Sequence, residues 1–173
     1  MASIQAKIIH KALQLQAYGW AKGTIAEQRS KQEKTARFFK IPKDVTVNKL
    51  TIGEIQAEII ECENSNNGVF LYLHGGAYAL GSVNVHREFL AILAKACQLK
   101  VLAINYRLAP ENPFPAALED SLAAYHWLLS NGYEPSHIVI AGDSAGGGLA
   151  VATLVSLRDS QIPLPACAVC ISP

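Results

Sequence analysis

Residues 138–150 read IVIAGDSAGGGLA, and this stretch decides the fold. Its first four residues are apolar and mostly β-branched, which favours a short buried strand. The small residues from Ala145 onward favour a helix. Between the two, the pattern G-x-S-x-G places Ser144 at the apex of a strand-turn-helix junction.

A serine at such an apex must adopt strained backbone angles, and the residues two positions away on each side must be glycine to avoid a steric clash. Gly142 and Gly146 meet this requirement. On its own, G-x-S-x-G also occurs by chance in glycine-rich loops. Here the strand before it and the helix after it supply the context that the motif needs, so we predict that Ser144 is a nucleophile.

Length and composition favour one globular domain. The chain has 173 residues, of which 50% are hydrophobic and 17% charged, and this composition excludes a disordered or fibrous protein. The formal net charge is +1 and no basic cluster stands out, so we expect no nucleic-acid or membrane partner. A small neutral or apolar molecule is the expected substrate.

The N-terminus carries no signal-peptide pattern, and no run of about 18 apolar residues occurs anywhere in the chain. We therefore expect a soluble, cytoplasmic protein. Of the four cysteines, Cys167 and Cys170 form C-x-x-C, but they fall in a predicted strand, 166–171, where residues three apart point to opposite faces. Core packing of the cysteines is the favoured interpretation, and we expect no metal and no cofactor.

The first 40 residues have helical character. An apolar stripe at Ile4, Ile8, Ala12 and Leu15 predicts one helix, glycines interrupt it, and Thr24 with Glu27 forms a capping-box pattern that opens a second helix towards Phe39. Taken alone, these residues predict a helical hairpin that packs on the rest of the chain.

Beyond residue 44 the pattern changes to strands and helices. Residues 45–60 alternate with a period of two around Gly53 and predict an antiparallel pair. Apolar strands are predicted at 69–73, 101–104, 138–141 and 166–171, and helices at 86–96, 118–129 and 145–158. Strand-helix alternation of this kind predicts an α/β fold with a mostly parallel sheet and helices on both faces.

A second glycine motif follows the strand at 69–73. Residues 74–78 read HGGAY, and consecutive glycines after a buried strand let backbone amides approach a bound group. A tight turn alone would explain two glycines. Together with the motif at Ser144, however, the pair favours an oxyanion-binding turn.

Four stretches together resemble the hormone-sensitive-lipase-like esterases of the α/β-hydrolase fold, a group that includes small bacterial carboxylesterases and lactone hydrolases. The stretches read HGGAY at 74–78, YRLAPE at 106–111, FPAA at 114–117 and GDSAGG at 142–147, and their order and spacing match over about residues 40–173. The resemblance implies a serine carboxylester hydrolase for short-chain esters or lactones, which forms an acyl-enzyme in two steps. It also implies that residues 1–40 belong to a cap and residues 41–173 to part of the catalytic domain.

By the same resemblance, Ser144 is the nucleophile. The amides of Gly76, Ala77 and Ala145 form the oxyanion hole, with Gly75 in the same turn. The family usually has a third glycine where Ala77 stands, so we expect the hole to persist if the backbone there keeps a negative φ.

The remaining family positions are structural by resemblance. His74 supports the oxyanion turn, Asp143 with Gly142 and Gly146 shapes the serine turn, and Arg107–Glu111 is expected to be a structural ion pair.

A serine nucleophile of this fold needs an acid and a histidine later in the chain, but only Asp159 and no histidine follow Ser144. The histidines at 10, 74, 86, 126 and 137 all precede it, and none is expected to replace the base. The sequence thus predicts an N-terminal part of a larger fold whose C-terminal strands are missing. Three alternatives stay open: an enzyme completed in its full-length form, a truncated inactive relative that binds small molecules, and a chain whose sheet and triad are completed by a separate complementing fragment. The sequence also leaves the oligomeric state open, including a homo-oligomer.

Overall fold

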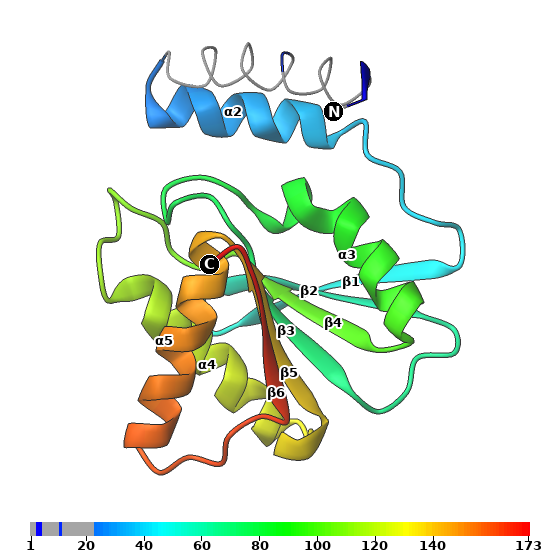
Figure 1. Cartoon of the computed structure of the whole chain (residues 1–173), viewed down its shortest axis with the longest axis vertical. Helices are drawn as coiled ribbons and strands as arrows, with labels where there is room; N and C mark the ends of the chain where they lie inside the picture. Colours follow the sequence, from blue (N-terminus) through cyan, green and yellow to red (C-terminus); the bar gives the residue numbers. More distant parts are fainter. Residues whose placement is uncertain (1–2, 5–10, 12–22) are drawn as a thin grey trace.

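The computed structural model describes residues 3–4, 11 and 23–173. Its strands are β1 (Val45–Ile52), β2 (Ile55–Cys62), β3 (Val69–Leu73), β4 (Lys100–Ile104), β5 (Ile138–Asp143) and β6 (Cys167–Ile171). They form one sheet in the order β1-β2-β4-β3-β5-β6 (Figure 1). The four strands from β4 to β6 are parallel, while β2 pairs antiparallel with both β1 and β4. The prediction of a mostly parallel sheet with an antiparallel pair at residues 45–60 is confirmed.

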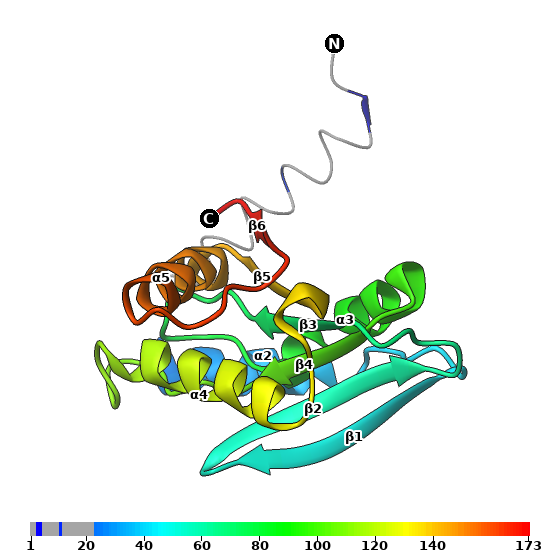
Figure 2. The same cartoon turned by 90° about the horizontal axis from the view of Figure 1, so that it is seen from below.

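The helices are α2 (Ile25–Ala36), α3 (Val83–Cys97), α4 (Ala116–Ser130) and α5 (Ala145–Asp159), with a 3-10 turn at Pro135–His137. Helix α3 covers one face of the sheet, and α4 and α5 cover the other (Figures 1 and 2). All five residues of β3 are buried, because this central strand is covered on both faces.

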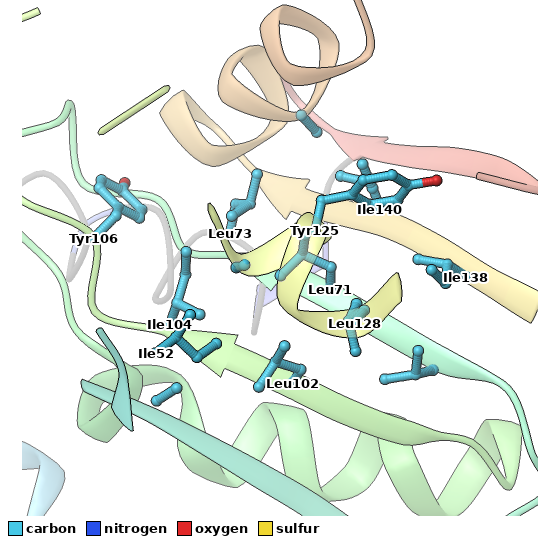
Figure 3. Close-up of a cluster of buried hydrophobic side chains, with 14 of the residues drawn as sticks. Ile52, Leu71, Leu73, Leu102, Ile104, Tyr106, Tyr125, Leu128, Ile138 and Ile140 are labelled. Carbon is cyan, nitrogen blue, oxygen red and sulfur yellow. The ribbon is translucent and has the colours of Figure 1, made fainter. Parts of the chain in front are cut away.

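Alternate residues of each central strand feed two separate cores. Leu71 and Leu73 point towards α4 and α5, where they join Tyr125 and Leu128 (Figure 3). Phe70 and Tyr72 join the α3 side instead. Because the side-chain period of a strand is two, this alternation fixes the register of β3 and, with it, the position of the turn that follows.

Helix α3 begins three residues earlier than the predicted start at His86. Ser82 is its N-cap, and the Ser82 hydroxyl accepts a hydrogen bond from the Val85 amide at 3.3 Å. The apolar pattern alone does not reveal this cap. His86 therefore lies within the first turn of α3.

The predicted capping box at Thr24 and Glu27 is confirmed. The Thr24 hydroxyl accepts from the Glu27 amide at 3.2 Å, and the Glu27 carboxylate accepts from the Thr24 amide at 2.8 Å. Helix α2 ends at Ala36 rather than reaching Phe39. Apart from Ile4, the apolar stripe predicted for the first helix lies outside the described residues.

The cysteine prediction is only partly correct. Cys170 is half-buried against α5 and its thiol donates to the Gly147 carbonyl at 3.6 Å, whereas Cys167 is exposed, as expected for residues on opposite faces of β6. Cys97 is also exposed. The core interpretation is therefore wrong for Cys97 and Cys167. Cys97 is the last residue of an exposed helix end, and Cys167 lies on a face of β6 that no described helix covers.

Strand β6 forms one edge of the described sheet, and its apolar side chains Val169 and Ile171 are more than 40% exposed. None of the helices in the described part of the chain is long and apolar enough to cross a membrane.

Candidate active site

Ser144 occupies the sharp junction between β5 and α5. Its backbone has φ 50° and ψ −123°, a strained combination for a residue with a side chain. The Ser144 amide donates to the Ile171 carbonyl at 2.8 Å, which ties the junction to β6. The residue is exposed, and within residues 23–173 no hydrogen bond is made by its hydroxyl. The prediction of strained backbone angles at this serine is confirmed.

The glycines on either side of Ser144 are required by close backbone contacts. A Cβ at Gly142 would lie 2.4 Å from the Gly146 carbonyl oxygen, and a Cβ at Gly146 would lie 1.9 Å from the Leu73 carbonyl oxygen. Both distances are far below van der Waals contact. The two glycines therefore let the first turn of α5 pack directly on the ends of β3 and β5, which brings Ser144 to the end of β3.

Residues 74–81 follow β3 at this same end of the sheet. We call them the oxyanion turn, because the sequence predicts oxyanion donors there. Its Gly76 carbonyl accepts the amides of Ala79 and Leu80 at 3.0 and 2.8 Å. Among the described residues, no acceptor pairs with the amide of Gly76 or Ala77. The amide of Ala145, the first residue of α5, is likewise unpaired there, as expected at a helix N-terminus. These donors can receive a developing negative charge.

Gly75 has a different role from the amides that follow it. Its amide donates to Asp143 Oδ1 at 2.9 Å, so this donor is already engaged. A Cβ at Gly75 would lie 2.2 Å from Asp143 Oδ2, which explains the glycine. Gly75 thus anchors the oxyanion turn to the end of β5.

The sequence made an oxyanion donor at Ala77 conditional on a negative φ, and this condition is not met. The Ala77 amide is nevertheless without an acceptor among the described residues. Ala77 has φ 53° and Tyr78 has φ 57°, so two consecutive non-glycine residues are left-handed. The reversal of the chain between Gly76 and Leu80, closed by the two hydrogen bonds to the Gly76 carbonyl, requires these angles. Each left-handed residue costs roughly 1–2 kcal/mol, so contacts elsewhere must hold this turn.

Asp143 links three elements behind the serine. Its Oδ1 accepts from the Tyr72 hydroxyl at 2.8 Å and from the Gly75 amide, and lies 3.5 Å from His86 Nε2. Burial opposes ionisation of the Asp143 carboxyl, but the hydrogen bonds from His86 and Tyr72 and the charge of His86 outweigh it and hold its pKa at about 2. A carboxylate that is so strongly stabilised is too weakly basic to take up a proton at neutral pH.

His86 is the site residue that sequence reasoning missed. Its Nδ1 lies 3.0 Å from the Ser82 carbonyl oxygen, while its Nε2 faces the Asp143 carboxylate. Both ring nitrogens thus face acceptors, which favours the doubly protonated imidazolium. Burial opposes this charge, but the hydrogen bonds to Asp143 and Ser82 outweigh it and raise the pKa of His86. The signal that could have revealed it is Ser82, the N-cap of α3, because a helix that starts at Val83 has His86 in its first turn, where it reaches Asp143.

His74 is buried at the start of the oxyanion turn. Its side chain is 2% exposed, its ring stacks on Tyr106 with centroids 4.3 Å apart, and its Nδ1 donates to the Gly75 carbonyl at 2.9 Å. Burial lowers the pKa of His74 to about 4, so the ring is neutral at pH 7. His126 and His137 lie on α4 and at the opposite end of β5, away from Ser144.

The predicted ion pair between Arg107 and Glu111 is wrong. Arg107 binds the buried Asp120 carboxylate of α4, with Nε to Oδ1 at 2.9 Å, and also the exposed Glu119. Glu111 pairs instead with Arg29 of α2 at 2.9 Å. Because the Asp120 carboxylate also accepts the Arg107 backbone amide at 2.7 Å, Arg107 is held against α4 and turned away from Glu111. Both pairs are still structural.

A cavity of about 310 Å³ opens beside the oxyanion turn. It is lined largely by apolar side chains of the turn, the loop after β4, and helices α4 and α5, including Tyr78, Ala109, Phe114, Leu118, Leu149 and Ala152. Its size and lining suit a small apolar group.

Comparison with known proteins places this arrangement in a family. Residues 70–173, more than half of the chain, match the family described as alpha/beta hydrolase fold. The chain belongs to this family. An acetyl-hydrolase of Streptomyces hygroscopicus is 52% identical over 124 residues, which are 72% of this chain and 42% of that protein.

Solved structures of the α/β-hydrolase family agree. An esterase of the bacterial hormone-sensitive lipase family superposes with a TM-score of 0.84 and 46% identity, over 88% of this chain and 52% of the other. A hormone-sensitive lipase homologue from a metagenome library superposes with a TM-score of 0.85 and 35% identity, over 95% and 56%. The chain therefore spans about half the length of the relatives that it matches. The resemblance to hormone-sensitive-lipase-like esterases, drawn from four sequence motifs, is confirmed.

Proposed function

We propose that Ser144 is the nucleophile of a carboxylic-ester hydrolase, and that Gly76, Ala77 and Ala145 donate to the oxyanion. The proposal is carried by one observation: at one end of the sheet, an exposed serine in a strained turn meets three amides that have no acceptor within residues 23–173. Gly75, His74, Asp143, Gly142 and Gly146 would hold these groups in place. Residues 1–40 would contribute to a cap over residues 41–173.

The reaction would proceed in two steps. The Ser144 Oγ–H proton passes to a base while Oγ bonds to the ester carbonyl carbon, and the carbonyl oxygen takes up the negative charge beside the three amides. The intermediate then collapses, the bond to the alcohol oxygen breaks, and the alcohol leaves with a proton. Water repeats both events on the acyl-serine and releases the carboxylic acid.

We further propose that the triad acid and base come from outside these 173 residues, since no histidine follows Ser144. In enzymes of this kind, loss of the triad serine or histidine costs on the order of 10⁶ in kcat, while the oxyanion hole and binding retain roughly 10³–10⁴ over water. The chain alone would accordingly acylate slowly and turn over poorly.

Short-chain esters or lactones are the proposed substrates. The cavity of about 310 Å³ beside Tyr78 is large enough for a short acyl or alcohol group, and the relative named acetyl-hydrolase supports a small acyl group. The near-neutral charge of the chain agrees with an uncharged substrate.

The test is covalent labelling of the 173-residue chain, because labelling needs no turnover. The chain is incubated with p-nitrophenyl butyrate and with a fluorophosphonate, whose phosphorus bonds to Oγ as fluoride leaves, and adducts are located by intact-mass and peptide mass spectrometry. We expect one adduct, at Ser144, that Ser144→Ala abolishes. Ser160→Ala, which removes an exposed serine at the far end of α5, is the matched control. Equal labelling of wild type and Ser144→Ala would refute the proposal.

A further inference from the structure

Helix α2 is held on the molecule without a buried apolar face. None of its 12 residues is buried, and its largest apolar side chain, Ile25, is 37% exposed. Helix α3, by contrast, buries Leu90, Ala91 and Ala94 completely. Hydrophobic burial is the usual force that positions a helix. The position of α2 must therefore be set by polar contacts.

Arg29 makes most of these contacts. Its Nε donates to the Ala79 carbonyl at 2.8 Å and one terminal nitrogen donates to the Ala109 carbonyl at 2.7 Å. The same guanidinium grips both carboxylate oxygens of Glu111, at 3.0 and 2.9 Å. Hydrogen bonding from Arg29 lowers the pKa of Glu111. One side chain thus joins the oxyanion turn to the loop after β4, and the planar fork of arginine is what allows it.

Two more residues of the same helix face hold the end of the oxyanion turn. Gln32 Oε1 accepts from the Gly81 amide at 3.0 Å. The Glu33 carboxylate accepts from the Ser82 hydroxyl at 2.5 Å and from the Asn84 amide group at 2.8 Å. Positions three and four residues apart lie on one face of a helix, so Arg29, Gln32 and Glu33 act together. Figure 1 shows α2 lying over the loop between β3 and α3.

These contacts fall where the turn needs restraint. Ala77 and Tyr78 are left-handed, and strained residues persist only when the surroundings over-determine them. Asp143 holds the turn at its start, through the Gly75 amide. The contacts from α2 hold its end at residues 79 and 81, and they also bind the start of α3 at residues 82 and 84.

We infer that Arg29 is a positioning residue for the oxyanion turn: from α2 it fixes the Ala79 carbonyl against the Ala109 carbonyl and so keeps the amides of Gly76 and Ala77 aimed at the substrate oxygen. This role rests on the function proposed above, but the restraint itself can be measured without any reaction. Helix α2 then fixes the conformation of the oxyanion turn in addition to covering it.

Hydrogen exchange of the Ala79 and Leu80 amides tests the restraint. Both donate to the Gly76 carbonyl and neither donates to α2, so they report on the turn rather than on the deleted contact. We expect exchange at both amides to be about tenfold faster in Arg29→Ala, with a smaller increase in Arg29→Lys, because lysine can replace only part of the fork. Lys31→Ala, an exposed change on the same helix, should leave both rates at the wild-type value.

Fluorophosphonate labelling of Ser144 is measured on the same variants. We expect slower labelling in Arg29→Ala and a wild-type rate in Lys31→Ala. Unchanged exchange at Ala79 and Leu80 in Arg29→Ala overturns the positioning role, whatever the labelling rate. Faster exchange with an unchanged labelling rate also overturns it. If wild type itself is not labelled at Ser144, the proposed function fails, while faster exchange still supports the restraint by α2.

Discussion

The close contact between Gly146 and the end of β3 leads us to predict the effect of a methyl group at this position. A methyl group at position 146 would lie 1.9 Å from the Leu73 carbonyl oxygen and 2.6 Å from the His74 carbonyl oxygen. Both obstacles are backbone atoms of the strand end, so no rotamer change relieves the clash. Gly146→Ala must therefore move the first turn of α5 away from β3.

The required displacement is about 1.5 Å, the difference between an ordinary contact of 3.4 Å and the 1.9 Å at this position. Overpacking costs typically about 1–3 kcal/mol, and occasionally more when backbone must move. The preference of helices for alanine over glycine returns up to about 1 kcal/mol. We expect Gly146→Ala to lower the free energy of unfolding by roughly 1–3 kcal/mol and to slow labelling of Ser144.

The same helix supplies matched controls. A Cβ at Gly148 meets nothing closer than the Tyr78 hydroxyl at 3.5 Å, and a Cβ at Gly147 lies 3.1 Å from the Gly142 carbonyl oxygen. Gly148→Ala should raise stability by about 0.5–1 kcal/mol through helix propensity alone, and Gly147→Ala should fall between the other two. Circular dichroism during urea and thermal unfolding gives the order.

A gap of about 1.5–4 kcal/mol between the outer variants corresponds to a difference of roughly 3–16 °C in Tm for a chain of this size. Equal stability of Gly146→Ala and Gly148→Ala would contradict the close approach of α5 to β3 that the structure shows. It would also contradict the steric requirement for glycine at position 146.

Two further changes test the charges around the site. The pKa of His86 is raised above its ordinary value of 6.5. The stability that protonated His86 contributes is therefore complete below pH 6.5 and is lost as the pH rises through its folded pKa. We expect urea midpoints measured from about pH 6.5 to 9 to fall with pH in wild type and to stay constant in His86→Gln. In this pH range His74 does not contribute, because its lowered pKa of about 4 affects stability only below about pH 6.5. A constant urea midpoint in wild type would contradict a protonated His86. Asp120→Ala should cost roughly 1–3 kcal/mol because it leaves the Arg107 backbone amide without its acceptor. Glu119→Ala removes only the exposed partner of the same arginine and should cost at most about 1 kcal/mol. Equal losses of unfolding free energy in Asp120→Ala and Glu119→Ala, measured by urea unfolding, would contradict the larger contribution of Asp120.

The elements of the fold were predictable because they depend on local pattern. Strands β3 and β5 are continuous apolar runs, and α2 carries its capping box in its own sequence. The need for glycine at 142 and 146 was predictable as well, because a serine at a strand-turn-helix junction leaves no room for a Cβ two residues away on either side.

Partners that lie far apart in the chain were not predictable in this way. Glu111 binds Arg29, 82 residues away, although Arg107 is close to it in sequence and equally suited by charge. Choice among several cations depends on which loops face each other, and periodicity carries no information about that. His86 was missed for a related reason, because its place depends on where α3 starts relative to the end of β5.

The left-handed angles at Ala77 and Tyr78 were the least accessible to sequence reasoning. Neither residue favours such angles, so the local preference points the wrong way. Contacts from other elements hold these angles: Asp143 binds the start of the turn, the Ala109 amide donates to the Tyr78 carbonyl at 2.8 Å, and α2 binds the end of the turn.

The hydrogen bond from the Ser144 amide to the Ile171 carbonyl ties the serine to an edge strand of the described sheet. Edge strands open locally at lower free energy than central ones, so each fraying of β6 also frees the backbone of Ser144. We therefore expect the backbone geometry of Ser144 to fluctuate with the opening of this strand. Any segment that pairs with β6 would suppress this opening and would thereby affect the reactivity of Ser144 without contacting it.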